Sequence, residues 1–336
     1  MRIMLSSEHR YPMMTGVSFG PHPKIFSSGS GHHLHDLLAK GLAEFGHEVL
    51  YWLPFEPAAP LPPGVRWISE PDASADIHHD VGVGGEHLIE FMKSHGKPSV
   101  STCHLDRSTL PEPRRKEDRR WIYVSKTLAR SHNSARYVLN GLDPSNYRYS
   151  AAKQEYFLFM SAVERAWGKG LKTAFRLAQW TGMRLVVAGT ASEYSKIHEM
   201  ARVCRENGAE YVGDVQGSKK ADLFAGAKAF LFPTDLNEAF GLVMVEALLS
   251  GTPVICSDKG ACPEVIGSEA GFVCREWDDY VAAVERLGEI RPQDCLRSAL
   301  DRFHYHCMTT GYIREYEAEI AGDGPKSPGE LCITAS

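Results

Sequence analysis

The sequence predicts an α/β protein with two Rossmann-like, doubly wound domains that face each other across a cleft. Short β-like runs alternate with amphipathic stretches almost from end to end, which is typical of parallel sheets covered by helices. Each half of the 336 residues holds about six such runs, and the chain is long enough to bury two cores. Because ligands bind at the carboxyl ends of strands in such sheets, we expect the chemistry in strand-to-helix loops that line the cleft.

The first domain is predicted over residues 1–148. "GHHLHDLLAKGLAEFG" has the apolar spacing of a helix that follows the first strand. "NGLDPSNYRYSAAKQ" carries Gly, Pro, Asn and Ser without periodicity, which places the domain boundary near residue 150. The expected strands of this domain are RIMLS, HEVLYWL, ADIHHDVGV, PSVST, RWIYV and ARYVL.

The second domain is predicted over residues 149–300. "LVMVEALLSG" is apolar on all sides, which predicts a buried helix closed by Gly251. A long C-terminal helix is expected over residues 301–321, packing back toward the first domain, and the tail 322–336 has the composition of a disordered linker. The expected strands of the second domain are EYFLFMS, MRLVVAG, AEYVGDV, AKAFLFP, TPVICS and GFVC.

Composition narrows the class of protein further. The net charge of −5, without a strong basic excess in either half, argues against nucleic acid as a partner. No apolar run reaches the roughly 18 residues of a membrane span, the N-terminus lacks the layout of a signal peptide, and the eight cysteines include no C-x-x-C pair, so we expect a cytoplasmic protein. The run "PRRKEDRRW" at 113–121 indicates a solvated face or, at most, peripheral contact with an anionic membrane.

The stretch "LNEAFGLVMVEALLSG" carries two carboxylates, Glu238 and Glu246, on either side of seven mostly apolar residues. Glu246 is the only charge of its helix, and a vicinal diol such as a ribose offers two donors to one carboxylate. Glu238 lies in the loop before the helix, where the backbone N–H groups of Phe240, Gly241 and Leu242 make an anion site. The two acids could therefore hold different parts of one elongated ligand. The alternative is a helix-start acid and a core ion pair.

These motifs resemble the family-4 (group 1) retaining glycosyltransferases of GT-B fold. The resemblance begins at the two glutamates and "SGTPVICSDKGACPEVIG", and it continues through most of the chain. It implies transfer of a sugar from a UDP- or GDP-sugar to a hydroxyl of a glycan, lipid-linked or small-molecule acceptor, with retention, without metal or other cofactor. The supporting segments are "GSGHHLHDLLAKGLAEFGHEV", "ADIHHD", "VSTCH", "VLNGLD", "KGLKTAFRLA", "LVVAG" and "YVGDV".

The resemblance also assigns roles to residues. Glu246 would bind the donor ribose, and Glu238 would contact the transferred sugar and the charge that develops at its anomeric carbon. Val215 would hold the nucleotide base through its backbone, and His104 would reach the donor sugar from the first domain. A Gly-rich loop would present its amides to the diphosphate or the acceptor; its residues are Gly29, Ser30 and Gly31.

The chain departs from the family at the cations expected beside the diphosphate. Where Gly-Arg is usual, "FMSAVERAWGKGL" has Ser161 and Ala162, whereas Lys169 matches the family lysine. We expect Arg165 to take the role of the missing arginine, because an unneutralised diphosphate departs slowly. The alternative is that Arg165 is a surface residue and Lys169 acts with the helix N-terminus. Lys220 is a further candidate near the phosphates or the base.

The remaining hypotheses concern metals and other protein classes. His78 and His79 are adjacent on a strand and point to opposite faces, so they do not ligate one metal easily, and we predict no metal site. A nicotinamide-dependent dehydrogenase would need G-x-G-x-x-G directly after the first strand, which "GSGHHL" does not supply. A catalytically silent nucleotide-sugar-binding protein or partner subunit is the main alternative to an enzyme.

Overall fold

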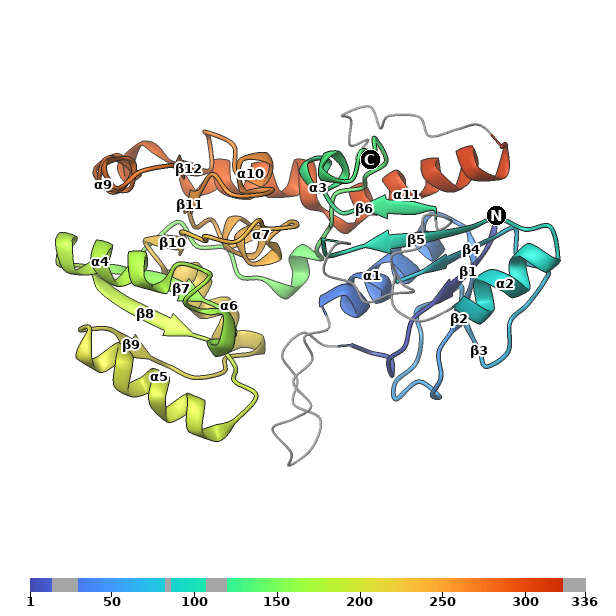
Figure 1. The fold of residues 1–336 in the computed structure, drawn as a ribbon, viewed down its shortest axis with the longest axis horizontal. Helices are drawn as coiled ribbons and strands as arrows, with labels where there is room; N and C mark the ends of the chain where they lie inside the picture. Colours follow the sequence, from blue (N-terminus) through green and yellow to red (C-terminus); the bar gives the residue numbers. More distant parts are fainter. Residues whose placement is uncertain (14–29, 82–85, 107–119, 323–336) are drawn as a thin grey trace. The chain divides into compact units, whose positions relative to one another are not determined.

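The structure is a computed structural model that describes residues 1–13, 30–81, 86–106 and 120–322 (Figure 1). The chain forms two compact units. Unit 1 comprises the described residues of 1–142 together with 302–322, and unit 2 comprises residues 143–301. The observed division between the units, after Leu142, thus lies a few residues before the boundary expected near residue 150. The expected tail lies outside the described residues from 323 onward.

Unit 1 is built on a six-stranded parallel sheet with the strand order β3-β2-β1-β4-β5-β6. Its central strands are almost wholly buried because helices cover the sheet, which explains the apolar runs in the sequence. The strands are β1 (Arg2–Ser6), β2 (Glu48–Trp52), β3 (Val65–Ile68), β4 (Ile77–Asp80), β5 (Ser99–Cys103) and β6 (Trp121–Tyr123). The helices are α1 (Ser30–Glu44), α2 (Glu86–Ser94), α3 (Lys126–Ser131) and α11 (Tyr305–Ile320).

The last helix, α11, packs on the sheet and on α1 of unit 1. The hydroxyl of Tyr316 lies 2.6 Å from Nδ1 of His79 on β4, and the hydroxyl of Tyr312 lies 2.7 Å from Oγ1 of Thr102 on β5. A methyl group at Gly41 of α1 would collide with Thr309, so the two helices are in close contact. The C-terminal segment therefore completes the core of unit 1.

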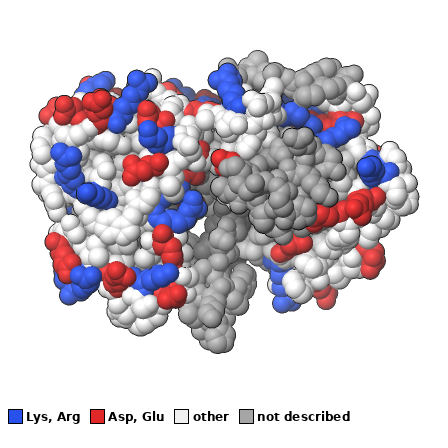
Figure 2. Space-filling model, in the orientation of Figure 1, with Lys and Arg blue, Asp and Glu red and all other residues white. Residues whose placement is uncertain are grey.

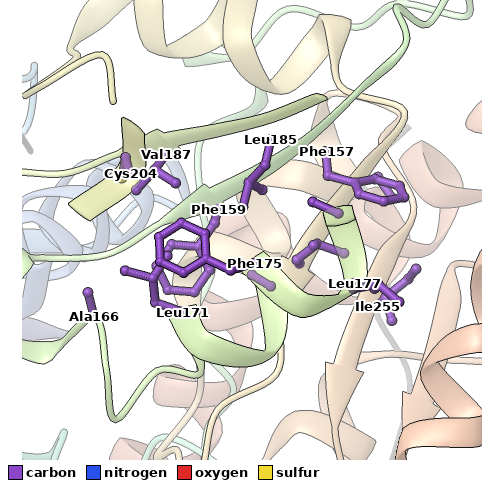
Figure 3. Close-up of a cluster of buried hydrophobic side chains, with 14 of the residues drawn as sticks. Phe157, Phe159, Ala166, Leu171, Phe175, Leu177, Leu185, Val187, Cys204 and Ile255 are labelled. Carbon is purple, nitrogen blue, oxygen red and sulfur yellow. The ribbon is translucent and has the colours of Figure 1, made fainter. Parts of the chain in front are cut away.

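Unit 2 repeats the same architecture, with strand order β12-β11-β10-β7-β8-β9 and all strands parallel. Its core is a cluster of aromatic and aliphatic side chains between the sheet and α4, centred on Phe157, Phe159 and Phe175 (Figure 3). The strands are β7 (Tyr156–Met160), β8 (Arg184–Ala188), β9 (Glu210–Tyr211), β10 (Ala229–Phe232), β11 (Val254–Ser257) and β12 (Gly271–Cys274). The helices are α4 (Leu171–Thr181), α5 (Tyr194–Glu206), α6 (Gly217–Gly226), α7 (Leu242–Leu249), α8 (Cys262–Val265), α9 (Trp277–Glu285) and α10 (Pro292–Phe303), with short 3₁₀ turns η2 (Pro144–Asn146), η3 (Val163–Arg165) and η4 (Leu287–Glu289).

Two doubly wound parallel sheets confirm the predicted fold class, but three elements differ from the prediction. The run "ARYVL" is not a strand: Tyr137 forms only an isolated bridge to Tyr123 at the edge of the sheet. Strand β3 escaped prediction because it is four residues long, follows two prolines and a glycine, and is largely unburied. The C-terminal helix predicted over residues 301–321 begins only at Tyr305, because residues up to Phe303 form the end of α10.

The break between α10 and α11 has a backbone cause. At His304 the chain is extended (φ −64°, ψ 140°), and it pairs with Leu142. The N–H of Leu142 donates to the carbonyl of Phe303 at 2.8 Å, and the N–H of Tyr305 donates to the carbonyl of Leu142 at 3.0 Å. These bonds replace helical ones, so the helix restarts at Tyr305.

In the described part of the chain, no helix combines the length and apolar character needed to cross a bilayer. On the surface of unit 2, on the left of Figure 2, Lys and Arg are interspersed with Asp and Glu. Positive and negative charges are therefore mixed on this face, whose described residues form no large patch of one sign.

Candidate functional site

The candidate site of unit 2 lies where the strand order of its sheet reverses, between β7 and β10. From β7 the chain proceeds to β8 and β9 on one side, and from β10 it proceeds to β11 and β12 on the other. The loops that leave two such strands diverge and open a crevice at the carboxyl edge, which we call the switch point of the unit. Lys169 follows β7 and Glu238 follows β10, so the sequence places opposite charges at this position.

Lys169 and Glu238 form an ion pair across the switch point of unit 2. Their side chains are only 10% and 15% exposed. The Lys169 ammonium also lies 5.1 Å from the centroid of the Phe232 ring, close enough for a cation–π interaction. Because both charges are largely buried, each needs a partner. A ligand could replace these partners if it offered a negative group to Lys169 and hydroxyl donors to Glu238.

Glycines fix the loops that carry this pair. Gly170, at φ 88°, directly precedes α4, and a methyl group there would collide with the carbonyl oxygen of Pro233. Gly260, at φ 57°, follows β11, and a methyl group there would collide with the backbone of Glu238. The next residue, Ala261, donates its N–H to the Glu238 carbonyl at 2.8 Å. The loop after β11 therefore holds the Glu238 backbone in place, and Gly170, in the loop after β7, packs on Pro233 at the end of β10.

Glu246 lies on α7 and is 6% exposed. Its Oε1 accepts hydrogen bonds from the Lys220 ammonium on α6 at 2.6 Å and from the Tyr147 hydroxyl at 3.1 Å. Burial, and then the nearby carboxylate, raise the pKa of Tyr147 well above its ordinary value, so this phenol stays protonated and donates. Among the described residues, no group donates a hydrogen bond to Oε2 of Glu246. One carboxylate oxygen is therefore held and the other can accept.

The start of α7 lies between the two glutamates. Gly241 precedes the helix in the left-handed region (φ 88°, ψ 60°), and no side chain caps the first turn. Phe240 is buried and anchors the loop, while Leu242 is the first helical residue. The N–H groups of a first helical turn have no partners within the helix, and they favour an anion. The structure thus brings Glu238, the α7 amides and Glu246 into one continuous segment.

Two predicted residues of unit 2 lie apart from these contacts. Arg165 ends η3 and is exposed, and its side chain forms no hydrogen bond or ion pair with any described residue. Val215 lies between β9 and α6, where it lines a cavity of about 410 Å³ together with Val212 and Lys219. Neither glutamate of the site lines that cavity. The roles expected for Arg165 and Val215 therefore remain predictions.

In unit 1, His104 directly follows β5, and its ring lies against the backbone of Gly31 on α1. Burial, and then the neighbouring His32, lower the pKa of His104 to about 4, so this imidazole is neutral at pH 7. Its Nε2 is buried and has no hydrogen-bond partner in the described part of the chain. Of the other loop residues predicted here, Gly29 lies outside the described residues, and of Ser30 only the backbone, at the start of α1, is described.

Tyr147 is the site residue that sequence analysis missed. It lies in the connection "NGLDPSNYRYS", just after η2, and is distant in sequence from Glu246. No periodicity or motif marks it, because its role depends on where the connection passes α7.

As for metals, the described residues contain no group of three His, Cys, Asp or Glu side chains placed to hold an ion.

Comparison with known families points to one activity class. Residues 146–298 match the family model described as glycosyl transferases group 1. The O-antigen chain mannosyltransferase B of Escherichia coli is 34% identical over 136 residues, which are 39% of this chain and 35% of the relative. The D-rhamnosyltransferase WbpZ of Pseudomonas aeruginosa is 24% identical over 289 residues, which are 76% of this chain and 72% of the relative. The chain therefore spans about a third of the first relative and nearly three quarters of the second.

Solved structures resemble the chain over nearly its whole length. A glycosyltransferase involved in avilamycin A biosynthesis is 25% identical, with a TM-score of 0.73 over 96% of this chain and 98% of the other. The Anabaena protein HepE, solved in complex with UDP-glucose, is 15% identical, with a TM-score of 0.67 over 94% of this chain and 99% of the other. The second likeness is one of fold.

Proposed function

The chain belongs to the group 1 glycosyltransferases and has the GT-B fold, and from this premise we propose that it transfers a sugar from a nucleotide-diphosphate sugar to an acceptor hydroxyl. The observation that carries the proposal is the pair of carboxylates after β10, each bound to a lysine. The lysines neutralise both carboxylates, while Oε2 of Glu246 can still accept a hydrogen bond from a nucleotide sugar. The resemblances to a mannosyltransferase and a rhamnosyltransferase support hexosyl transfer in polysaccharide, glycolipid or natural-product synthesis.

The donor would lie along the segment from Glu238 to Glu246. Oε2 of Glu246 would accept from the ribose hydroxyls, while Lys220 and Tyr147 hold the carboxylate through Oε1. The diphosphate would bind the first-turn amides of α7 and the ammonium of Lys169. In this arrangement Lys169 exchanges the Glu238 carboxylate for phosphate, and Glu238 becomes free to accept from sugar hydroxyls.

The reaction we propose proceeds with retention at the anomeric carbon. The bond from that carbon to the diphosphate breaks, the phosphate oxygen leaves with the electron pair, and the acceptor oxygen forms its bond on the same face. The departing oxygen takes the acceptor proton. Lys169 stabilises the leaving charge and Glu238 the charge at the anomeric centre, which is how preorganised groups lower such barriers.

The other predicted residues extend this proposal. Val215 and His104 would contact the base and the donor sugar, and Gly31 would offer its backbone to the donor or acceptor. Arg165 would add a second cation if it turns toward the diphosphate. Since these roles are assigned to side chains and amides, the proposal requires no metal ion, and a chelator should leave the rate unchanged.

Donor hydrolysis and transfer by the full chain test the proposal. Wild-type protein is incubated with UDP- and GDP-sugars, and released nucleotide is measured. We expect Glu238→Gln to lower the rate by roughly 10²–10³-fold, as for loss of one transition-state contact, while UDP or GDP still raises the Tm. The matched control is Glu155→Gln, which breaks an exposed Glu–Lys pair of the same unit and should change nothing.

Three outcomes would contradict this assignment. Full activity of Glu238→Gln would remove that carboxylate from the chemistry. Stabilisation of the wild type by nucleoside diphosphates without any turnover would favour the alternative, a nucleotide-sugar-binding protein that is catalytically silent. Failure of every nucleotide to raise the Tm would reject the donor site itself.

A further inference from the structure

A chain of hydrogen bonds begins at the switch point of unit 1, between β1 and β4. Ser7 directly follows β1, and its Oγ lies 2.9 Å from Nδ1 of His9 and 2.7 Å from Nδ1 of His32. Nε2 of His9 lies 2.9 Å from Oδ1 of Asp36 on α1. Ser7, His9 and Asp36 are buried, at 1%, 5% and 7% exposure. We call the series of Asp36, His9, Ser7 and His32 the relay.

With a neutral His9, the hydrogen bonds of the relay fix the position of its protons. A carboxylate only accepts, so Nε2 of His9 carries a proton, and in the neutral ring Nδ1 is then an acceptor. Ser7 therefore donates its one hydroxyl proton to His9. The contact of Ser7 with His32 can then form only if His32 donates from Nδ1, which leaves Nε2 of neutral His32 with a free lone pair.

Asp36 is well held as the end of the relay. Its Oδ1 also accepts from the Tyr51 hydroxyl at 2.7 Å, and its Oδ2 accepts from the N–H of Met13 at 2.7 Å. Burial, and then this carboxylate, raise the pKa of Tyr51 well above its ordinary value, so the phenol remains a donor. Three donors on one buried carboxylate orient His9, and His9 in turn orients Ser7 and His32.

The free end of the relay points to a ligand. Nε2 of His32 has no hydrogen-bond partner in the described part of the chain, and the side chain is half-buried. Its neighbour His104 has a buried Nε2 that also lacks a partner. Two neutral imidazoles, each with a ring nitrogen that lacks a partner among the described residues, therefore lie at the carboxyl edge of this sheet. The partner that satisfies Nε2 of His32 has to be a hydrogen-bond donor.

We propose that Nε2 of His32 is a hydroxyl-binding site for a neutral sugar or polyol acceptor, and that Ser7, His9 and Asp36 are positioning residues that keep this nitrogen unprotonated. The inference rests on the proposed function, because it names the group of unit 1 that recognises the acceptor. A neutral ligand fits because the carboxylate behind the relay disfavours an anion and burial disfavours a cation. Hydroxyls supply the donor that an imidazole acceptor requires.

The first test is the tautomer, read from histidine ring-nitrogen NMR of the ¹⁵N-labelled full chain at pH 7.5. We expect His9 protonated at Nε2, and His32 protonated at Nδ1 with a bare Nε2. A doubly protonated His9 would reverse both hydrogen bonds of Ser7, to His9 and to His32, and put the proton on Nε2 of His32. That result would overturn the proposal, and it needs no variant.

The second test is binding of methyl α-D-mannopyranoside, followed by saturation-transfer NMR. His32→Asn is chosen because the asparagine amide replaces Nδ1–H toward Ser7 and deletes only Nε2. His33→Asn is the matched control, because in the described part of the chain His33 forms no hydrogen bond with a residue of the relay. Its Nδ1 instead lies 2.9 Å from the Met13 carbonyl oxygen. We expect at least 10-fold weaker binding for His32→Asn, an unchanged value for His33→Asn, and the same Tm for both.

Ser7→Ala separates positioning from mere packing. Without the hydroxyl, His32 loses the partner of Nδ1, so its proton should redistribute toward Nε2 in the NMR spectrum while glycoside binding falls. Wild-type binding by His32→Asn, or no glycoside binding by the wild type, would overturn the inference. If UDP or GDP still raises the Tm in that case, the donor proposal stands alone; if neither ligand is bound, both proposals fall.

Discussion

The two switch points of the molecule share a strand order and differ in chemistry. In unit 2 the position between β7 and β10 carries the ion pair of Lys169 and Glu238, and residues 143–301 contain one histidine, His198. In unit 1 the position between β1 and β4 carries imidazoles and hydroxyls linked to one buried carboxylate. One fold therefore presents charges at one edge and neutral acceptors at the other, which shows that function follows from the loops and not from the sheet.

The two units also differ in the charge state of their buried side chains. Burial and neighbouring imidazoles lower the pKa of His32, His35 and His79 in unit 1, as they do for His104. Unit 2 instead keeps its charges and pairs them. A nucleoside diphosphate needs such charges, whereas a neutral acceptor does not.

The largest effect should come from the cation of unit 2. We expect Lys169→Met to lower the transfer or hydrolysis rate by roughly 10²–10³-fold, because the leaving diphosphate loses its counter-charge and Glu238 is left unpaired. Lys172→Met, on the exposed side of α4, is the control and should be neutral. Steady-state rates of Arg165→Met complete the comparison. A larger loss for Arg165→Met than for Lys169→Met would transfer the role to that arginine.

Acid should destabilise unit 1 through its buried imidazoles. The folded pKa of His104, about 4, lies below the ordinary value of 6.5, so the native state binds fewer protons between these values and stability is lost as the pH falls from 6.5 toward 4. The loss from this residue should be up to about 3 kcal/mol. Urea unfolding at pH 7, 6, 5 and 4 measures it. His104→Gln should flatten the profile, and His198→Gln, which is exposed in unit 2, should not. Parallel profiles for all three proteins would contradict this account.

The loop that holds Glu238 can be tested with a pair of glycines. Gly260→Ala and Gly208→Ala both place alanine at positive φ, 57° and 72°, which costs about 1 kcal/mol. Only the methyl at Gly260 would strike the Glu238 backbone, while that at Gly208 meets nothing within 4 Å. We expect Gly260→Ala to lose roughly 1–3 kcal/mol more in chemical unfolding, with lower activity. Equal losses would mean that the loop yields without moving Glu238.

The smallest effect should come from the phenol of Tyr147. Tyr147→Phe removes one of two donors to Oε1 of Glu246 and leaves Lys220 in place. We expect affinity for UDP or GDP to fall about fivefold, the equivalent of roughly 1 kcal/mol, as measured by calorimetric titration. Tyr149→Phe, at an exposed tyrosine two residues on, is the control. If both variants bind equally well, the phenol plays no part in positioning Glu246.

The sequence predicted what is encoded locally. Glu238, Gly241 and Glu246 lie within one segment, so their spacing alone indicates a loop followed by a buried helix. The twelve strands follow a regular alternation, apart from the short β3. The two sheets could therefore be predicted, and so could their doubly wound order.

What escaped prediction depends on segments that meet only in the folded chain. Tyr147 reaches Glu246 from 99 residues away, and the relay joins Ser7 to His32 across 25 residues. The helix break at His304 arises because the backbone of Leu142 takes its hydrogen bonds. Neither hydrophobic periodicity nor motif spacing carries information on such contacts.

Calorimetric titration of two variants tests the central claim that the two carboxylates of unit 2 bind opposite ends of one donor. The ligands are a nucleoside diphosphate and the same diphosphate bearing its sugar. We predict that Glu246→Gln weakens both by about tenfold, and that Glu238→Gln weakens only the sugar-bearing ligand. Equal losses for both ligands in both variants, or no loss in either, would contradict the account.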